Sequence, residues 1–342
     1  MGLFSKSFSP ETDLPDLKGN VIIVTGGNSG VGCAAIQHLA RKGAKVYMAA
    51  RSEEKAKAAI EKVQKAGLEP GNGEVVWLPL DYSDPRDAKK AAEVFMEKEQ
   101  RLDIVVNSAA LLLTPFTKTS DGIQEIAVVN YFSPFVFVRT LLPLLKRTAQ
   151  EPKSDVRIVM LTSEGHRMPP KDCHFRSIED FNREFKDESF ASNRRYNLSK
   201  YMGVLHVKEL QRRLDAEEVP IIVTAVHPGI VNTGDTILYL GLSEKCSLHD
   251  SDGVQNFAHS AGTFKAPVYA FIANAFFTSP EKGAYSTVFA AAAPAVREDV
   301  KYKGGYIVPP GKLGSVYSPT EDPELGKELW ETTEKILADI GV

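Results

Sequence analysis

The chain has 342 residues, of which 43% are hydrophobic and 25% are charged, so it is long enough to bury a sizeable core. Its formal net charge of -3 gives no basic footprint for nucleic acid, which we therefore exclude as an expected partner. Three widely spaced cysteines, Cys33, Cys173 and Cys246, favour a reducing compartment over a disulfide framework, so we expect a cytoplasmic protein.

Strand and helix patterns alternate along the chain. A β-branched run at residues 21–24 leads through a glycine-rich turn into a helical stretch that ends near Lys42. Further strands are predicted at residues 46–49, 75–78, 104–106, 156–161, 221–226 and 305–308, and further helices at residues 53–66, 85–99 and around Asn130. This order predicts an α/β fold: a doubly wound parallel sheet with helices on both faces and ligands at the carboxyl ends of its strands.

The turn after the first strand has the composition of a phosphate-binding loop. Gly26, Gly30 and Gly32 permit a tight turn and let backbone N–H groups approach a pyrophosphate at the N-terminus of the following helix. The residues expected to bind a dinucleotide here are Thr25, Gly26, Asn28, Ser29, Gly30, Val31 and Gly32.

Tyr196 and Lys200 stand four positions apart in a stretch with a helical pattern. Residues at i and i+4 lie on one face of a helix, with Cβ atoms roughly 5–6 Å apart, so an ammonium can stand beside a phenol. An unperturbed tyrosine has a pKa of roughly 10, and a fixed positive charge nearby favours the phenolate and lowers that pKa. The pair therefore predicts a proton carrier in a nicotinamide-dependent redox enzyme.

Together these motifs resemble the short-chain dehydrogenase/reductase family over nearly the whole chain. The resemblance rests on the spacing of Thr25 to Gly32, on Tyr196 and Lys200, and on Pro228-Gly229 followed by Thr233. Within the family, Ser163-Glu164-Gly165-His166-Arg167 and the ending near Trp330 look like the retinol dehydrogenases and the catalytic domain of WW-domain oxidoreductase. The resemblance implies a single Rossmann-type domain at residues 18–342, after an N-terminal extension at residues 1–17.

The resemblance also implies a catalytic tetrad of Asn130, Ser163, Tyr196 and Lys200. Ser163 would donate a hydrogen bond to the substrate oxygen, and Tyr196 would give or take its proton. Lys200 would hold the nicotinamide ribose and depress the tyrosine pKa, while Asn130 would fix a water that links Lys200 to solvent. Thr162, which precedes Ser163, is the alternative hydroxyl donor.

Further cofactor contacts are expected at the ends of the other strands. Arg51 follows the second strand, where a guanidinium suits the 2'-phosphate of NADP, so we expect NADP(H) in preference to NAD(H). Asp81 resembles the family aspartate that meets the adenine. The remaining expected contacts, besides Tyr196 and Lys200, are Tyr82, Asn107, Ala109, Pro228, Gly229, Val231 and Thr233.

Residues 234–280 follow Thr233, where family members close over the substrate, and they are rich in aromatic residues. We interpret this segment as a lid over a bulky lipophilic ketone, aldehyde or secondary alcohol. Two alternatives stay open: reduction of an activated C=C bond, and an NADP-binding regulatory protein that has lost turnover.

Two other chemistries are not expected. His166, Cys173 and His174 match no tetrahedral ligand spacing, so we expect no metal. Ser163 with His166 and Asp172 lacks the G-x-S-x-G elbow of an esterase. We also expect no transmembrane segment, and we allow for a homo-oligomer.

Overall fold

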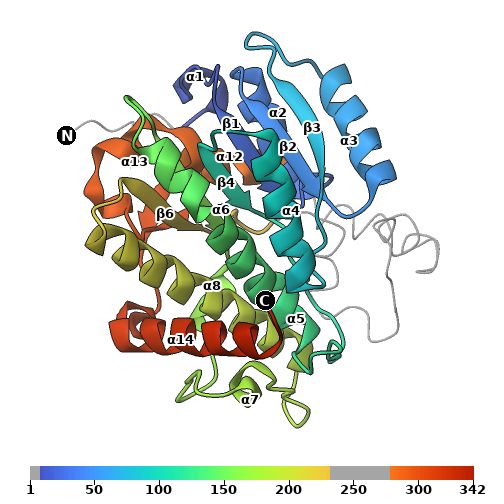
Figure 1. Cartoon of the computed structure of the whole chain (residues 1–342), viewed down its shortest axis with the longest axis vertical. Helices are drawn as coiled ribbons and strands as arrows, with labels where there is room; N and C mark the ends of the chain where they lie inside the picture. Colours follow the sequence, from blue (N-terminus) through green and yellow to red (C-terminus); the bar gives the residue numbers. More distant parts are fainter. Residues whose placement is uncertain (1–7, 232–277) are drawn as a thin grey trace.

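The computed structural model describes residues 8–231 and 278–342. Its strands are β1 (Val21–Thr25), β2 (Lys45–Ala50), β3 (Glu74–Pro79), β4 (Ile104–Asn107), β5 (Val156–Leu161), β6 (Ile221–Val226), β7 (Tyr306–Val308) and β8 (Lys312–Gly314). Within these residues they form an eight-stranded sheet in the order β3-β2-β1-β4-β5-β6-β7-β8 (Figure 1). Neighbouring strands from β3 to β7 are parallel, and β8 pairs antiparallel with β7. The doubly wound α/β fold expected from the sequence is confirmed.

Helices connect the strands, and several begin at a capping residue followed by proline. The longer helices are α2 (Gly30–Arg41), α3 (Glu53–Lys65), α4 (Pro85–Lys98), α6 (Ser133–Ala149), α8 (Ala191–Ala216), α12 (Pro280–Ala292) and α14 (Pro323–Asp339). The shorter elements are α1 (Pro10–Asp13), α5 (Glu125–Ala127), η1 (Val128–Phe132), η2 (Glu164–Arg167), α7 (Ile178–Phe181), α13 (Pro294–Glu298), η3 (Val300–Tyr302) and η4 (Ser318–Glu321). Asp84 caps α4 by accepting from the N–H of Arg86 at 2.8 Å, and Asp322 caps α14 in the same way.

Both faces of the sheet are buried, which explains why its strands read as continuous apolar runs rather than as alternating ones. In β1, Ile22 and Val24 pack with residues of α2, α3 and α12. Ile23 points to the other face and packs with residues of α4, α6 and α8. The sheet therefore lies between two helical layers, and its carboxyl edge is the place where the loops meet.

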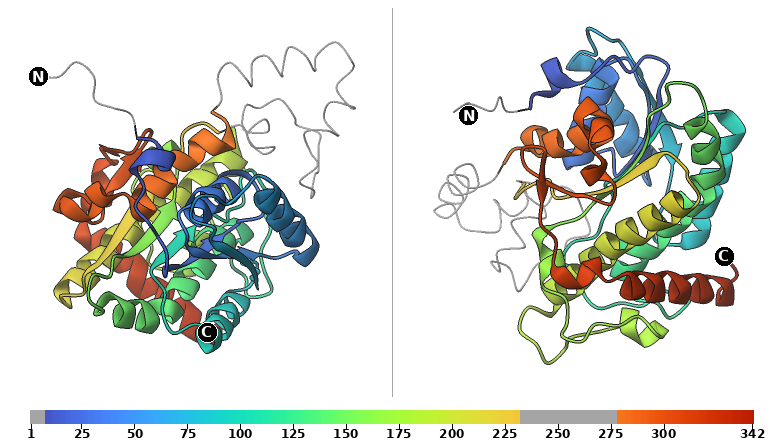
Figure 2. Two further views of the ribbon diagram at one scale, coloured as in Figure 1. Left: turned by 90° about the horizontal axis from the view of Figure 1, so that it is seen from above. Right: turned by 90° about the vertical axis from the view of Figure 1, so that its left-hand side faces the viewer.

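The C-terminal helix α14 adds a third layer on that second face. It lies along α8, as Figure 2 shows from two further sides. Trp330 of α14 stacks on the ring of His206 of α8, with ring centroids 5.5 Å apart, and meets Phe135 of α6 at 4.7 Å. His206 is 2% exposed, and its two ring nitrogens have no hydrogen-bond partner in the described part of the chain.

Two leucines of the expected N-terminal extension belong to the core. Leu14 and Leu17 are buried on the face of the sheet that α2 covers.

Among the described residues one helical run, Glu125–Ala149, is long and apolar enough to span a membrane, and 72% of its apolar window is buried inside the protein. Its apolar side chains serve packing against α4, α8 and α14.

The buried His206 predicts a stability that depends on pH. Burial lowers the pKa of His206 to about 4, against a smaller opposing effect of Glu209. In the unfolded chain His206 binds a proton near pH 6.5, whereas in the folded protein it stays neutral down to about pH 4. The free energy of unfolding is therefore unaffected by His206 above pH 6.5 and decreases as the pH falls from there towards about 4. His206→Phe should remove this loss.

Urea unfolding of the wild type and of His206→Phe at a series of pH values checks this. The wild type should lose on the order of 3 kcal/mol more than the variant between about pH 7 and pH 4. The other histidines are common to both proteins, so they cancel in the difference. Parallel stability curves would show that His206 is not held neutral by the fold.

Candidate active site

The glycine turn lies between β1 and α2, and it is built for close packing. Gly26 has φ +64°, and a Cβ there would lie 2.9 Å from Cα of Ala109, in the loop after β4. A Cβ on Gly32 would lie 2.6 Å from the main-chain oxygen of Gly26. Thr25 Oγ1 accepts hydrogen bonds from the N–H groups of Ser108 and Ala109, both at 3.1 Å. The ends of β1 and β4 are thereby held together at the sheet's carboxyl edge.

The start of α2 fits an anionic ligand. Ser29 is the N-cap residue, but its side chain makes no capping hydrogen bond, and the first turn carries no acidic residue. The N–H groups of this turn and the positive end of the helix dipole are therefore not neutralised by the helix itself. A pyrophosphate is the kind of group that such a turn binds.

Residues at the ends of β2, β3 and β4 lie along the same edge. Arg51 is exposed directly after β2, and no acidic residue of the described chain forms an ion pair with it. Asp81 accepts a hydrogen bond from the N–H of Ser83 at 2.9 Å. Tyr82 is buried and donates to Asn107 Oδ1 at 2.8 Å, which leaves the buried Asn107 Nδ2 without a partner among the described residues. That amide is a free donor at the centre of the edge.

Tyr196 and Lys200 lie on one face of α8, as their spacing predicts. Lys200 Nζ is 5.5 Å from the centroid of the Tyr196 ring. Lys200 is 7% exposed, and its ammonium donates a hydrogen bond to the main-chain oxygen of Leu161 at 3.1 Å. Burial lowers the pKa of Lys200 to about 8. The charge beside the phenol is thus fixed in position and shielded from water.

Ser163 follows β5 at the same edge. Its Oγ accepts a hydrogen bond from the N–H of Gly165 at 3.0 Å, so the hydroxyl hydrogen stays free to point at a ligand. Thr162, the alternative donor, is buried, and its hydroxyl donates to the main-chain oxygen of Lys200 at 3.2 Å. The Thr162 hydroxyl is therefore engaged within the protein, and the role of Ser163 as the group that meets a substrate stays a prediction.

Asn130 lies in η1, a π-helical turn between α5 and α6. Its Oδ1 accepts from the N–H of Leu111 at 2.7 Å, and its Nδ2 donates to the oxygen of Leu111 at 2.9 Å. The same Nδ2 lies 2.9 Å from Ser199 Oγ on α8. The side chain therefore ties the loop after β4 to the helix of Tyr196. The expected role in fixing a water stays a prediction.

The segment after β6 completes the described edge. Gly229 has φ +90°, and Val231 forms a parallel bridge with Thr278. Thr233 and all but the end of the expected lid at residues 234–280 lie outside the described residues. The cofactor contacts expected at Pro228, Gly229 and Val231, which follow the end of β6, stay predictions.

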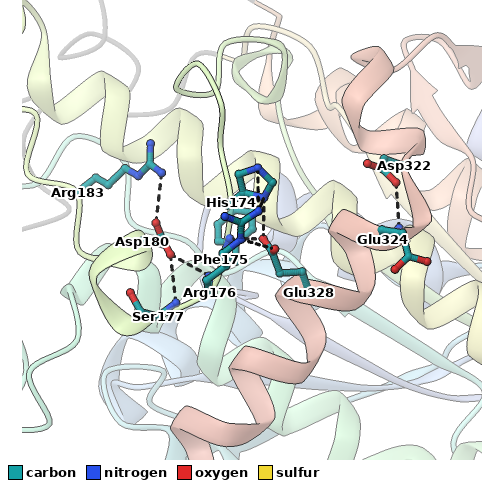
Figure 3. A network of polar contacts seen from close by, with 9 residues as sticks. All are labelled: His174, Phe175, Arg176, Ser177, Asp180, Arg183, Asp322, Glu324 and Glu328. Carbon is teal, nitrogen blue, oxygen red and sulfur yellow. Dashed lines mark hydrogen bonds and ion pairs between the residues drawn. The ribbon is translucent and has the colours of Figure 1, made fainter.

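His166 and His174, which the metal and esterase hypotheses used, form other contacts in the structure. The Nδ1–H of His166 donates to the main-chain oxygen of Ser163 at 2.7 Å, not to its hydroxyl. His174 contacts Glu328 at 3.1 Å, in a network with Arg176 that joins the segment before α7 to α14 (Figure 3). In residues 8–231 and 278–342 no group of three or more His, Cys, Asp or Glu side chains is placed to hold a metal ion.

Sequence reasoning did not single out two residues that shape the serine turn. A Cβ on Gly165 would lie 2.2 Å from Asn197 Oδ1 and 2.9 Å from Ser163 Oγ. Asn197 is 1% exposed and follows Tyr196 on α8. The sequence clue to Gly165 was its place in the run from Ser163 to Arg167. Its packing against Asn197 of α8 shows why the residue must be small.

The doubly wound sheet, the glycine turn and the Ser-Tyr-Lys group at its carboxyl edge define an oxidoreductase of the Rossmann type. The sequence matches the short chain dehydrogenase family over residues 20–173. It is 40% identical to a short-chain dehydrogenase/reductase of Armillaria gallica over 335 residues, which cover 97% of each protein. The chain belongs to the short-chain dehydrogenase/reductase family, and the closer likeness to the retinol dehydrogenase branch stays a prediction.

Solved structures agree on the fold. An uncharacterised protein of Mycobacterium paratuberculosis superposes with a TM-score of 0.66 at 22% identity and covers 97% of each chain. L-sorbose reductase of Gluconobacter frateurii, complexed with NADPH and L-sorbose, gives a TM-score of 0.62 at 18% identity, covering 88% of this chain and 98% of that one. At these identities the likeness establishes the fold alone.

The packing at Gly165 generates a prediction about turnover. Gly165→Ala should push Ser163 Oγ and the Asn197 amide apart, and so lower turnover towards the roughly 10²–10³-fold loss expected when one oxygen-binding donor is displaced. Steady-state kinetics with any substrate of the wild type, together with cofactor titration, measures this. Gly203→Ala on α8 is the matched control, because nothing lies within 4 Å of the added Cβ. Unchanged turnover in Gly165→Ala would contradict the proposed packing constraint on Ser163.

Proposed function

We propose that this protein is an NADP(H)-dependent oxidoreductase that interconverts a carbonyl and an alcohol on a bulky lipophilic small molecule. One observation carries the proposal: the buried Lys200 ammonium lies 5.5 Å from the centroid of the Tyr196 ring, at the carboxyl edge of the sheet where the glycine turn follows β1 and Ser163 follows β5. A phenol, a fixed cation and a free hydroxyl are the groups that proton transfer to a carbonyl oxygen needs.

Each residue has a task that follows from its surroundings. The bound nicotinamide supplies the hydride chemistry. Ser163, whose Oγ is held by the Gly165 N–H, donates its hydrogen to the substrate oxygen. Tyr196 gives its proton to that oxygen in reduction and takes it back in oxidation. Lys200 is predominantly charged at neutral pH with a pKa of about 8, and its charge favours the phenolate that forms in reduction.

The exposed apolar residues support a lipophilic substrate. Among the described residues, Met168 directly after η2 is 48% exposed, Phe190 directly before α8 is 76% exposed, and Ile230, four residues beyond the end of β6, is 60% exposed. Arg194 on α8 donates to the main-chain oxygen of Met168 at 3.1 Å, which links two of these segments. Apolar groups exposed around a polar reaction centre suit a ligand that buries them.

The proposal extends to a cytoplasmic location. Cys33 and Cys173 are free thiols, and burial raises the pKa of both. Free thiols of low reactivity suit a reducing compartment. A homo-oligomeric state stays a prediction.

Tyr196→Phe tests the reaction. Because Tyr196 carries the proton, the variant should lose turnover by the roughly 10²–10⁴-fold typical of general acid-base catalysis, with cofactor binding retained. The measurement follows NADPH absorbance with a panel of lipophilic ketones, aldehydes and activated alkenes. Turnover of alkenes alone would favour C=C reduction, and NADPH binding without turnover of any compound would favour a regulatory role. Near-normal carbonyl turnover in the variant would exclude Tyr196 as the proton carrier.

Arg51→Ala tests the cofactor preference. If the exposed guanidinium holds the 2'-phosphate through charge-assisted bonds worth about 1.5–3 kcal/mol, NADPH should bind roughly 10- to 100-fold more weakly, with NADH nearly unchanged. Titration of both cofactors by fluorescence measures the two affinities. Arg41→Ala is a suitable control, because its guanidinium binds the main-chain oxygens of Ala66 and Gly67 away from the strand ends. Equal losses for NADPH and NADH would assign Arg51 a structural role.

A further inference from the structure

Arg195, which directly precedes Tyr196 on α8, is a buried cation that the proposed reaction does not use. The residue is 5% exposed. Its NH1 donates to the main-chain oxygen of Glu184, and its NH2 donates to the main-chain oxygen of Thr114, both at 2.8 Å. NH2 also donates to Ser192 Oγ at 2.8 Å, one turn earlier on α8. The guanidinium therefore joins three parts of the chain.

The hydrogen bonds of the Arg195 guanidinium all go to neutral oxygens. Among residues 8–231 and 278–342 no carboxylate forms an ion pair with it, and its Nε–H is buried without a partner. Burial lowers the pKa of Arg195, and the charge of Glu184 opposes this only in part. A buried charge that is bonded only to neutral groups is costly, and such groups are retained where they do something that a neutral residue cannot.

The two carbonyls that Arg195 binds belong to loops beside the reaction centre. Thr114 lies in the loop after β4, three residues beyond Leu111, which Asn130 holds with two hydrogen bonds. Glu184 lies in the segment between α7 and α8 that ends at the exposed Phe190. The first loop is thus held at two points, by Asn130 and by Arg195, and the second point also holds the segment before α8.

We propose that Arg195 is a positioning residue that sets the wall of the substrate site. Its planar fork reaches two main-chain oxygens on different loops at once, which a lysine ammonium on a flexible stem does not do as well. It thereby places residues 111–114 and 184–190 relative to Tyr196. The expected effect on KM rests on the proposed function, whereas the expected effect on the position of the two segments does not.

The kinetic test uses Arg195→Met, which removes the charge and the fork, and Arg195→Lys, which keeps the charge. Arg195→Met should lower kcat/KM by roughly 10- to 100-fold, mainly through KM for the lipophilic substrate, with the NADPH affinity within about twofold of the wild type. Arg195→Lys should recover part of the loss. Arg212→Met on the same helix is the control, since Arg212 is paired with Glu209 and its side chain is 50% exposed. An unchanged substrate KM in Arg195→Lys or Arg195→Met would overturn the proposal.

A second measurement does not depend on turnover. Amide hydrogen exchange followed by mass spectrometry should be faster in residues 111–117 and 182–190 of Arg195→Met, and unchanged there in Arg212→Met. Should Arg195→Met fail to fold, Arg195→Lys carries the test, because it also loses one of the two carbonyl contacts. If exchange is faster in the Arg195 variants while the wild type reduces no carbonyl, the proposed function is rejected and the positioning role of Arg195 stands. Unchanged exchange in both Arg195 variants would reject that role itself.

Discussion

Two hydrogen bonds of opposite direction join the end of β5 to α8, and the rest of the site depends on this joint. Lys200 Nζ donates to the oxygen of Leu161 at 3.1 Å, and Thr162 Oγ1 donates to the oxygen of Lys200 at 3.2 Å. Both side chains are buried, so losing either bond would leave a polar group without water. Because Ser163 follows Thr162 directly and Tyr196 lies one turn before Lys200, the joint fixes the serine relative to the phenol.

The loops at the carboxyl edge are shaped by side chains of the regular elements rather than by their own contacts. Backbone groups beyond a strand end have no ladder partner and must find one elsewhere. Thr25 supplies it for the residues after β4, and Asn130 supplies it for Leu111. Because these donors and acceptors lie on the sheet and on helical turns, the loops inherit the rigidity of the core, which is what a site needs for fixed geometry.

Local sequence signals predicted strands β1 to β7, the glycine turn and the Tyr196 and Lys200 pair, because β-branched runs, glycines and helical spacing act over a few residues; the short antiparallel strand β8 was missed. The sequence placed Ser163 ahead of Thr162 by resemblance alone, and the physical difference between them is not local: adjacent residues of an extended chain point to opposite sides, and the position of α8 shows that the Thr162 hydroxyl is engaged. Arg195 was missed for a similar reason. An arginine in a helix normally reads as a solvated residue, and its burial arises from contacts with Glu184 and Thr114, 11 and 81 positions away.

Arg195 and Lys200 together give the start of α8 an unusual charge distribution. Both side chains are buried, both bond to main-chain carbonyls, and neither forms an ion pair within the part of the chain that the structure describes. The N-terminal end of a helix adds a partial positive charge of its own. Cations held without counterions in a dry environment exert a stronger field than paired ones. Such a field favours negative charge nearby, and in the proposed carbonyl reduction that charge arises as a phenolate on Tyr196, whose ring centroid lies 5.5 Å from Lys200 Nζ. In the proposed reaction the buried Lys200 charge, which is costly to desolvate, thus lies where it stabilises the phenolate.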